Sequence, residues 1–460
     1  MRFFDDNGAP GGMGLSGHPH VAVIGSGAAG LAAAWGLLRG GASVTLFEQD
    51  ARIGGHANTV THDWGDGPRA VDTGFIVYNE HNYPNLTGLF ATLGVETAAT
   101  DMSFSASFND GGFEYSGSGI GGLLARRRNA LSPSFWRMVR DIVRFYKEAP
   151  ALISQAGNLD LTLGEFLDRN GFSKSFANQH LLPMAAAIWS SPCLDMGRYP
   201  AQTFVRFFSN HGLLSLGERP QWRTVKGGSQ TYVSRLLAQA RPQIRRGVGV
   251  AQVRRTGAGV IVTERDGTAH KFSAVVMACH APQTRVLLAD QTPHEDAILS
   301  SFRTEDNLAV LHTDQSLMPR RKRAWASWNY IEAPQAQGRP SVSYWMNTLQ
   351  PLGTDKPVFV TLNPGRPLAA EKVLDSFTYA HPVFDSTAIA AQSRVSGIQG
   401  DGGVYYAGAW MGYGFHEDGI ESGLAAAEAI TGVRRPWAFD PAQARVPGAA
   451  QPLPLAAAAE

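Results

Sequence analysis

The chain of 460 residues is poor in the features that mark several classes of protein. It has two cysteines, Cys193 and Cys279, and their wide separation excludes a disulfide scaffold and a CxxC metal or redox site. A formal net charge of +1 provides no bulk attraction to nucleic acid. No apolar run reaches the roughly 18 residues of a membrane-spanning helix, and the first residues lack the apolar core of a signal peptide. We therefore expect a reducing, cytoplasmic setting and no bound metal.

The stretch His20–Ala57 has a regular order of elements. The β-branched run Val21–Ile24 predicts a buried parallel strand. An Ala/Leu-rich segment from Leu31 to Arg39 predicts a helix, and Ser43–Phe47 predicts a second strand. This order is typical of a unit that binds a dinucleotide at the turn between its first strand and its helix.

The turn itself carries a GxGxxG motif. Gly25 permits a tight turn, Gly27 lets a pyrophosphate approach the backbone, and Gly30 lets helix and strand pack closely. The helix N-terminus offers free N–H groups to the phosphate, and Glu48 can accept the hydroxyls of an adenosine ribose. The cofactor-binding residues expected in this unit are Gly25, Gly27, Ala28, Ala29, Gly30, Glu48 and Gln49.

Two further motifs follow, Arg52-Ile53-Gly54-Gly55 and Val71-Asp72-Thr73-Gly74-Phe75. With them the sequence resembles the flavoprotein superfamily of amine oxidases, phytoene desaturases and protoporphyrinogen oxidases. In that superfamily the acid, the RxGG run and the later DxG segment surround FAD from adenosine to flavin. Many members have Arg where this chain has His56, which is either a substitute phosphate contact or a polar loop residue. The resemblance implies FAD contacts at Arg52, Gly55, His56, Thr73, Gly74 and Phe75.

The segment from Val404 to Ile430 resembles the closing motif of the same superfamily. There a strand ends in Ala-Gly, a loop passes the flavin, and a helix N-terminus meets the flavin pyrimidine edge. The positive end of that helix dipole would stabilise the negative charge on a flavin that accepts hydride. A strand expected at 243–253 would place a backbone valine beside the adenine. The residues implied as FAD contacts are Val250, Gly408, Phe415, Asp418, Gly419 and Ile420.

The resemblance implies an α/β fold in which a Rossmann-like, GR2-type FAD-binding domain is interleaved with an α+β substrate domain of mixed sheet and helices. Alternating segments predict a hairpin at 102–115 and strands at 308–312, 327–330, 341–346 and 358–361. A second GxGxxG motif is missing, so we expect no NAD(P)H domain. The expected division is 18–95, 222–290 and 395–435 for the FAD-binding domain, 96–221 and 291–394 for the substrate or membrane-facing domain, and 1–17 and 436–460 for flexible tails.

The substrate is suggested by resemblance alone. The runs GGHANTV, LLPMAAAIWSSP and YAGAWMGYGFHEDG resemble a bacterial family of predicted NAD/FAD-binding proteins associated with cyclopropane-fatty-acid-synthase-like methyltransferases. Some of its members desaturate methylated membrane fatty acyl chains on the route to furan fatty acids. This implies hydride transfer from an acyl chain to FAD, with His416 and Glu417 as candidate bases or, alternatively, as caps and cofactor contacts. Phe415 aligns with a tyrosine of the amine oxidase cage, which favours hydrocarbon over amine.

Three other functions stay open: a flavin amine oxidase, a flavin-dependent fatty acid double-bond isomerase, and a non-catalytic FAD-binding protein. Basic residues also suggest a partner. An amphipathic helix after Ser132, with Phe135 and Trp136 on its apolar face, follows one arginine run. These residues are either solvated faces or a peripheral docking surface for anionic lipid at the inner face of the cytoplasmic membrane. The cations concerned are Arg126, Arg127, Arg128, Arg320, Arg321 and Arg323.

Overall fold

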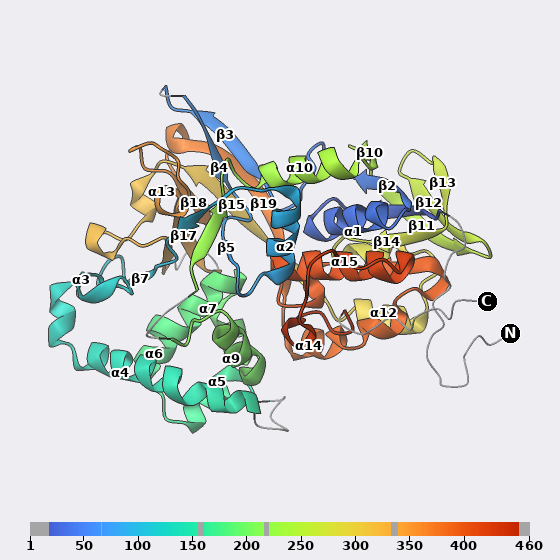
Figure 1. Cartoon of the computed structure of the whole chain (residues 1–460). Helices are drawn as coiled ribbons and strands as arrows, with labels where there is room; N and C mark the ends of the chain where they lie inside the picture. The colour runs from blue at the N-terminus through green and yellow to red at the C-terminus, as the bar shows by residue number, and fades with distance from the viewer. Residues whose placement is uncertain (1–17, 66, 155–160, 216–219, 333–338, 450–460) are drawn as a thin grey trace.

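The glycine motif lies at the carboxyl edge of β1 (His20–Ile24), inside a parallel sheet of five strands (Figure 1). Ile24 stands opposite Phe47, so the turn after β1 and Glu48 at the end of the next strand share one edge. Val21 to Ile24 are all buried, as expected for a central strand covered on both faces. From edge to edge the strands are β10 (Gln243–Arg246), β2 (Ser43–Glu48), β1, β14 (Ala274–Met277) and β20 (Val404–Tyr406).

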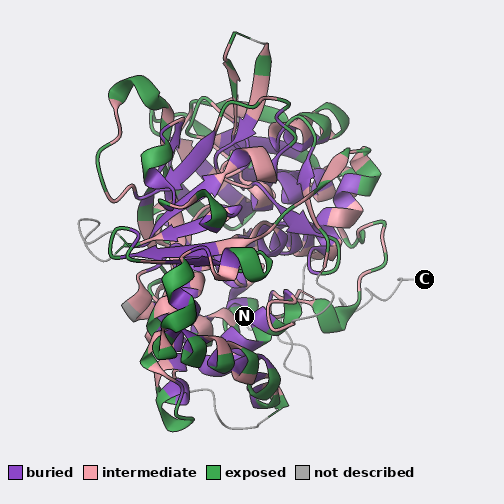
Figure 2. Ribbon diagram, turned by 90° about the vertical axis from the view of Figure 1, so that its left-hand side faces the viewer, coloured by how far each residue is buried: buried purple, intermediate pink, exposed green. Residues whose placement is uncertain are grey.

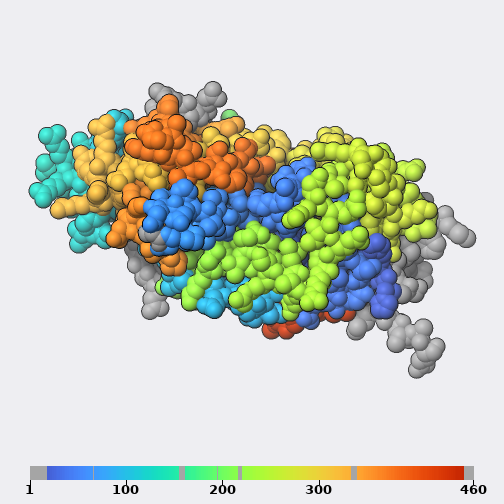
Figure 3. Space-filling model, turned by 90° about the horizontal axis from the view of Figure 1, so that it is seen from above, coloured from blue at the N-terminus to red at the C-terminus, as the bar shows by residue number. Residues whose placement is uncertain are grey.

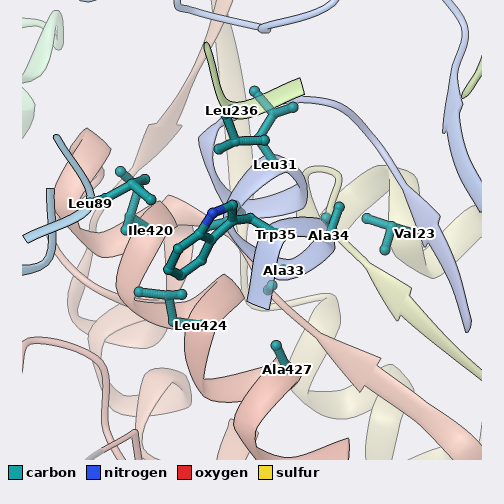
Figure 4. Packing of buried hydrophobic residues seen from close by; sticks show 14 of the residues in the cluster. Val23, Leu31, Ala33, Ala34, Trp35, Leu89, Leu236, Ile420, Leu424 and Ala427 are labelled. Atoms are coloured by element: carbon teal, nitrogen blue, oxygen red, sulfur yellow. The ribbon is translucent and has the colours of Figure 1, made fainter. Parts of the chain in front are cut away.

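Two helices cross closely on one face of this sheet, α1 (Ala28–Arg39) and α15 (His416–Thr431). A Cβ placed on Gly423 would lie 2.1 Å from the carbonyl oxygen of Ala29, so this contact requires glycine. Trp35 of α1 fills the space beside the crossing (Figure 4). Its neighbours come from α2 (Pro84–Leu93), α10 (Gln230–Ala240) and α15, and include Leu89, Leu236, Ile420 and Leu424.

A three-stranded antiparallel sheet covers the other face of the parallel sheet. Its first strand corrects the expectation of one continuous strand at 243–253. The strand predicted at 243–253 is two strands, because Gly247 (φ +72°) turns the chain out of the parallel sheet after β10. Residues 293–299 and 386–392, which fall in the expected substrate domain (291–394), form helices that share a buried core with β1 and β14. The elements are β11 (Val250–Thr256), β12 (Gly259–Glu264), β13 (Ala269–Phe272), α11 (Ala281–Leu287), α12 (Pro293–Leu299) and α14 (Ser386–Gln392).

The second region is built on a seven-stranded mixed sheet. The predicted hairpin is present as β7 and β8, and the four predicted strands form β15 to β18. An edge strand, β19, was not expected; its half-buried pattern and Pro382 obscure the signal, although proline is tolerated at a sheet edge. From edge to edge the strands are β19 (Val373–Val383), β15 (Arg303–His312), β18 (Phe359–Leu362), β17 (Ser341–Trp345), β16 (Trp328–Ile331), β7 (Phe104–Phe108) and β8 (Phe113–Ser116).

Helices pack below this sheet around an aromatic core, with their outer faces exposed (Figure 2). The predicted amphipathic helix is α4, and Ser132 caps it. Its faces differ from the prediction: Phe135 is fully buried, Trp136 is exposed, and Asp141 is buried, where it accepts the Ser173 N–H. These helices are α3 (Gly119–Leu123), α4 (Pro133–Glu148), α5 (Leu163–Arg169), α6 (Lys174–Phe176), α7 (Leu182–Trp189), α8 (Cys193–Arg198) and α9 (Ala201–Asn210), whereas α13 (Met346–Leu349) packs on β17 and β18.

Asp72 of the DxG segment joins distant parts of the chain. It accepts hydrogen bonds from Thr59, from the backbone and side chain of Ser229, and from Gln350. Burial raises the pKa of Asp72 to about 6. Small sheets surround this junction: β3 (Thr59–Asp63) with β4 (Pro68–Asp72), and β9 (Trp222–Val225) with β5 (Tyr78–Asn79) and β6 (Thr97–Thr100).

The computed structural model describes residues 18–65, 67–154, 161–215, 220–332 and 339–449, and the expected tail at 1–17 lies outside them. Residues 436–449 were expected to be mobile, but they pack on the α1/α15 layer. Trp437 stacks on Trp35 at 5.7 Å, and the side chain of Arg445 is 6% exposed. No described helix is long and apolar enough to cross a membrane. The whole is elongated, with α3 and α4 at one end and β11–β13 at the other (Figure 3).

Candidate active site

A large cavity of about 1150 Å³ connects the edge of the parallel sheet to the seven-stranded sheet. Its walls come from both regions: the turns after β1 and β2, the N-terminal end of α15, α7, α9, and strands β16 to β19. Ligand sites typically measure about 300–1,000 Å³. This cavity is therefore large enough for a dinucleotide together with a second molecule.

The glycine turn forms one wall of the cavity. Gly25 has φ +102°, which favours glycine, and a Cβ built on Gly27 would meet no atom within 4 Å, so open space lies beside the backbone there. No side chain caps α1, and its first turn contains no acid. The N–H groups at its start are therefore available to an anion in this space.

Glu48 lies beside the glycine turn, at the end of β2. Its Oε2 accepts the Ser26 N–H at 2.9 Å and the Ser26 hydroxyl at 2.6 Å, and its Oε1 accepts the Asp50 N–H at 2.9 Å. Arg52 braces the following loop by donating to the carbonyls of Gly55 (2.7 Å) and Ala57 (3.2 Å). This arrangement fixes a carboxylate at the cavity wall, where remaining lone pairs can accept hydroxyl groups.

Most of the residues predicted to contact the cofactor line the cavity, together with His416: Gly25, Gly27, Ala28, Ala29, Glu48, Gln49, Arg52, Gly55, His56, Thr73, Gly74, Phe75, Val250, Gly408, Phe415 and Gly419. The other three predicted cofactor contacts, Gly30, Asp418 and Ile420, lie behind the cavity wall. Gly30 packs against the Gly25 carbonyl, and the Asp418 carboxylate accepts the Phe415 N–H at 2.7 Å. Ile420 is a buried member of the α1/α15 core. These three shape the wall from behind.

Glu417 does not line the cavity, and of the roles expected for it, base, cofactor contact or cap, its contacts fit the cap. Its side chain is buried, Oε1 accepts the backbone and side-chain N–H groups of Asn85 at 2.8 Å, and Oε2 accepts the Leu86 N–H at 2.9 Å. Burial raises its pKa, and Arg445 opposes that rise. Glu417 is thus an N-terminal cap for α2, supplied by another helix.

His416 lines the cavity, but its imidazole already has partners. Its ring stacks on Phe75 at a centroid distance of 3.9 Å, and Nε2 lies 2.8 Å from the hydroxyl of Tyr232. Burial lowers its pKa to about 3. An imidazole with so low a pKa is a weak proton acceptor near pH 7, so His416 is better suited to a neutral packing and hydrogen-bonding role.

β19 adds cavity residues that the sequence analysis missed, among them Tyr379 and His381. The Tyr379 hydroxyl bonds to Asn58 at 2.9 Å and to Thr73 at 2.8 Å, and its ring stacks on His56. Burial is the main cause of two lowered pKa values. It lowers the pKa of His381 to about 4, and it lowers the pKa of His56 well below its usual value. The alternation of Phe377, Tyr379 and His381 was the available sequence signal.

The two ends of the cavity differ in polarity. Among the described lining residues, those with fully charged side chains are Glu48, Asp50, Arg52 and Arg265. All four belong to the β2 edge, since Arg265 bonds to Gln49. The opposite end is lined by apolar and aromatic side chains: Met102, Ile188, Trp189, Phe207, Leu213, Trp222, Trp328, Tyr344, Leu362, Phe377 and Phe415.

Residues 28–347 match the family described as flavin containing amine oxidoreductase. The chain belongs to that family. The protein AofH of Mycobacterium tuberculosis, which is assigned by inference as a flavin-containing monoamine oxidase, is 26% identical to this chain over 385 residues. These residues cover 81% of this chain and 77% of that protein.

Solved structures share the family fold. Wild-type putrescine oxidase bound to putrescine superposes with a TM-score of 0.67 at 16% identity, over 90% of this chain and 99% of that one. A fatty acid isomerase from P. acnes that produces CLA superposes with a TM-score of 0.63 at 17% identity, over 90% and 98%. At such identities the likeness establishes the fold.

The cofactor of this family enzyme is FAD, and the residues present fit it. The open space at Gly27 faces the uncapped start of α1, as a pyrophosphate requires. Glu48 supplies the acceptor for a ribose, and Gly419 brings the start of α15 to the same cavity. The charged end of the cavity therefore suits the dinucleotide, and the apolar end is left for a substrate.

Proposed function

We propose that this flavin amine oxidoreductase-family enzyme oxidises an apolar substrate, namely a methylated unsaturated fatty acyl chain of membrane phospholipid. The observation that carries the proposal is the apolar end of the cavity, where no described lining residue bears a full charge. Burying an acyl chain against such side chains is favourable by roughly 0.8 kcal/mol per CH₂ group. The substrate and its methylation also rest on the sequence resemblance described above.

An ammonium substrate would fit this end of the cavity less well. A buried cation needs a charged or hydrogen-bonding partner, and the described carboxylates of the lining, Glu48 and Asp50, lie at the dinucleotide end. Around Phe415 the neighbouring rings are Phe207 at 5.2 Å, Trp189 at 6.5 Å and His211 at 6.0 Å. None of these groups carries a negative charge.

Bound FAD supplies a two-electron acceptor that takes a hydride from a C–H bond. The protein holds the chain beside it, excludes water with aromatic side chains, and receives the accompanying proton. The histidines of the lining are His56, His211, His280, His381 and His416, and burial lowers the pKa of each. His416 and the other imidazoles whose pKa values fall furthest are weak proton acceptors, whereas a nearby carboxylate, Asp306, opposes the fall in the pKa of His280, so His280 is the histidine best able to take a proton released from an allylic carbon.

A flavin amine oxidase is the second candidate. The family assignment and the likeness to AofH and putrescine oxidase favour it. The rings of Tyr344 and Tyr413, which line the cavity, could hold a cation by cation–π attraction. A double-bond isomerase is the third, because the fold also includes the P. acnes fatty acid isomerase.

The test is anaerobic mixing of the FAD-loaded protein with phospholipid that contains methyl-branched unsaturated chains, with unbranched phospholipid, and with a panel of amines. Bleaching of the oxidised flavin band by the branched lipid, with a product two hydrogens lighter, is the expected result. Bleaching by an amine would replace the proposal with amine oxidation. A shifted double bond without bleaching would identify an isomerase, and no change with any compound would point to a non-catalytic flavoprotein.

A pair of variants ties the result to the cavity. Ile188→Asn places an amide in the apolar wall, whereas Leu308→Asn places the same group at an exposed position of β15. We expect the first to abolish reduction by lipid while FAD still binds, and the second to behave as the wild type. Equal rates in both variants would contradict the assignment of the apolar end as the substrate site.

A further inference from the structure

Two basic runs far apart in the sequence meet in one cleft. Arg126–Arg128 and Arg321–Arg323 line a hollow of about 490 Å³ together with Ala125. The first run leads into the 3-10 helix η1 (Arg127–Leu131), and the second leads into the 3-10 helix η5 (Lys322–Ala324). Six cationic side chains thus surround one small space.

Glu114 of β8 holds the two runs together. Its carboxylate is fully buried and accepts the N–H groups of Arg320 and Arg321 and the Arg321 guanidinium, at 2.7, 3.2 and 2.8 Å. Its backbone carbonyl accepts the side chain of Asn129, which belongs to η1, at 2.9 Å. A built-in support therefore places both runs at this cleft.

Acids neutralise only a small part of the positive charge of the cleft. Arg320 pairs with Asp110 and Arg321 with Glu114, but no ion pair joins Arg126, Arg127, Arg128, Lys322 or Arg323 to another described residue. Arg127, Arg128, Lys322 and Arg323 are exposed. Gathering uncompensated cations costs electrostatic repulsion, and an anionic ligand would relieve it.

Exposed apolar residues accompany these cations. Ile120 on α3 is 78% exposed, Leu131 at the end of η1 is 85% exposed, and Trp136 on α4 is 47% exposed. α3 packs against η5, and α4 packs against η1, so the residues belong to the same end of the molecule (Figure 3). Large apolar side chains beside a basic cleft are the combination that binds a membrane interface.

We infer that this end of the molecule docks on a bilayer that contains anionic phospholipid, with phosphate groups in the basic cleft and Ile120, Leu131 and Trp136 in the headgroup layer. Charge complementarity favours this partner, and the two aliphatic residues favour lipid over nucleic acid, whose bases offer stacking surfaces to aromatic rings. The inference is independent of the proposed substrate, because its test measures binding and involves no flavin reduction.

The first test is co-sedimentation of the full-length, FAD-loaded protein with phosphatidylcholine vesicles, with and without phosphatidylglycerol. Binding is expected on the anionic vesicles and should weaken as salt is added. The triple variant R127Q/R128Q/R323Q removes three cleft charges and should bind roughly a hundredfold more weakly. The control R246Q/R254Q/K271Q removes three exposed charges at the opposite end and should bind as the wild type.

A second test reports the contact itself. Brominated phosphatidylglycerol should quench part of the tryptophan fluorescence of the wild type, and that part should be absent in Trp136→Phe. The inference is overturned by equal binding of the two triple variants, by the same quenching in Trp136→Phe, or by saturable binding of duplex DNA or free phosphate without binding to vesicles.

Discussion

Arg445 lies beneath the start of α15 among three buried carboxylates, and replacing it by methionine tests how that end of the helix is held. Its Nη1 lies 3.8 Å from Oδ1 of Asp418, its guanidinium donates to the Asn82 carbonyl, and its backbone N–H donates to Glu421. Its positive charge lowers the pKa of Asp418 and Glu417 against the opposing effect of burial. Methionine keeps most of the volume and removes the charge.

The expected cost follows from the burial of both partners. Removing one member of a buried ion pair leaves the other uncompensated, which destabilises proteins by about 3–5 kcal/mol. Without Arg445, the folded-state pKa values of Asp418 and Glu417 rise further above their unfolded values of about 4. Groups with raised folded pKa values lose stability as pH rises, so the deficit should be larger at pH 8 than at pH 5.

The assay is urea unfolding of the FAD-saturated protein at both pH values, followed by circular dichroism. Arg434→Met is the matched control, since Arg434 is exposed in the same segment, and its free energy of unfolding should change by less than about 0.5 kcal/mol. A loss below about 1 kcal/mol for Arg445→Met that is equal at the two pH values would refute the reasoning.

Three further outcomes are expected. Glu417→Gln should lower the free energy of unfolding by about 1–3 kcal/mol through loss of the α2 cap, while stopped-flow absorbance shows an unchanged rate of flavin reduction; a slowed rate would restore a catalytic role. Glu48→Ala should weaken FAD binding about 10–100-fold in a fluorescence titration, and unchanged affinity would exclude its ribose contact. His312→Gln should make the stability measured by urea titration fall less steeply as pH drops from about 6.5 toward 4, because the folded-state pKa of buried His312 is lowered to about 4, and an unchanged pH profile would contradict that cause.

The cofactor half of the site was predictable because local backbone chemistry determines it. A dinucleotide needs a tight glycine turn, a helix start and an acid at the end of the next strand, and these lie within one continuous stretch. Accordingly, the glycine turn that begins at Gly25 lines one wall of the cavity, and Glu48 lines the same wall. The closing motif has the same property, since Gly408, Phe415 and Gly419 follow one another in a strand, loop and helix.

The substrate half depends on contacts between segments that the sequence does not relate. The place of Glu417 beside His416 in the flavin motif left base and cap both open, and its actual partner is the start of α2, which lies far away in the chain. Residues 436–449 looked like a tail because of their composition, yet Arg445 is held by carboxylates of α15. Such roles depend on tertiary contacts and have no local pattern.

The polarity of the cavity limits what family membership can say about the reaction. The dinucleotide end is formed by elements that any FAD-binding member needs, from the β1 turn to Gly419. The substrate end is formed by side chains of α7, α9 and the seven-stranded sheet, such as Ile188, Phe207 and Leu362, which contribute to no flavin motif. Charge at that end decides whether a cation or a hydrocarbon is bound, because an unpaired ammonium in an apolar wall is costly. An apolar substrate is therefore compatible with membership of a family named for amines.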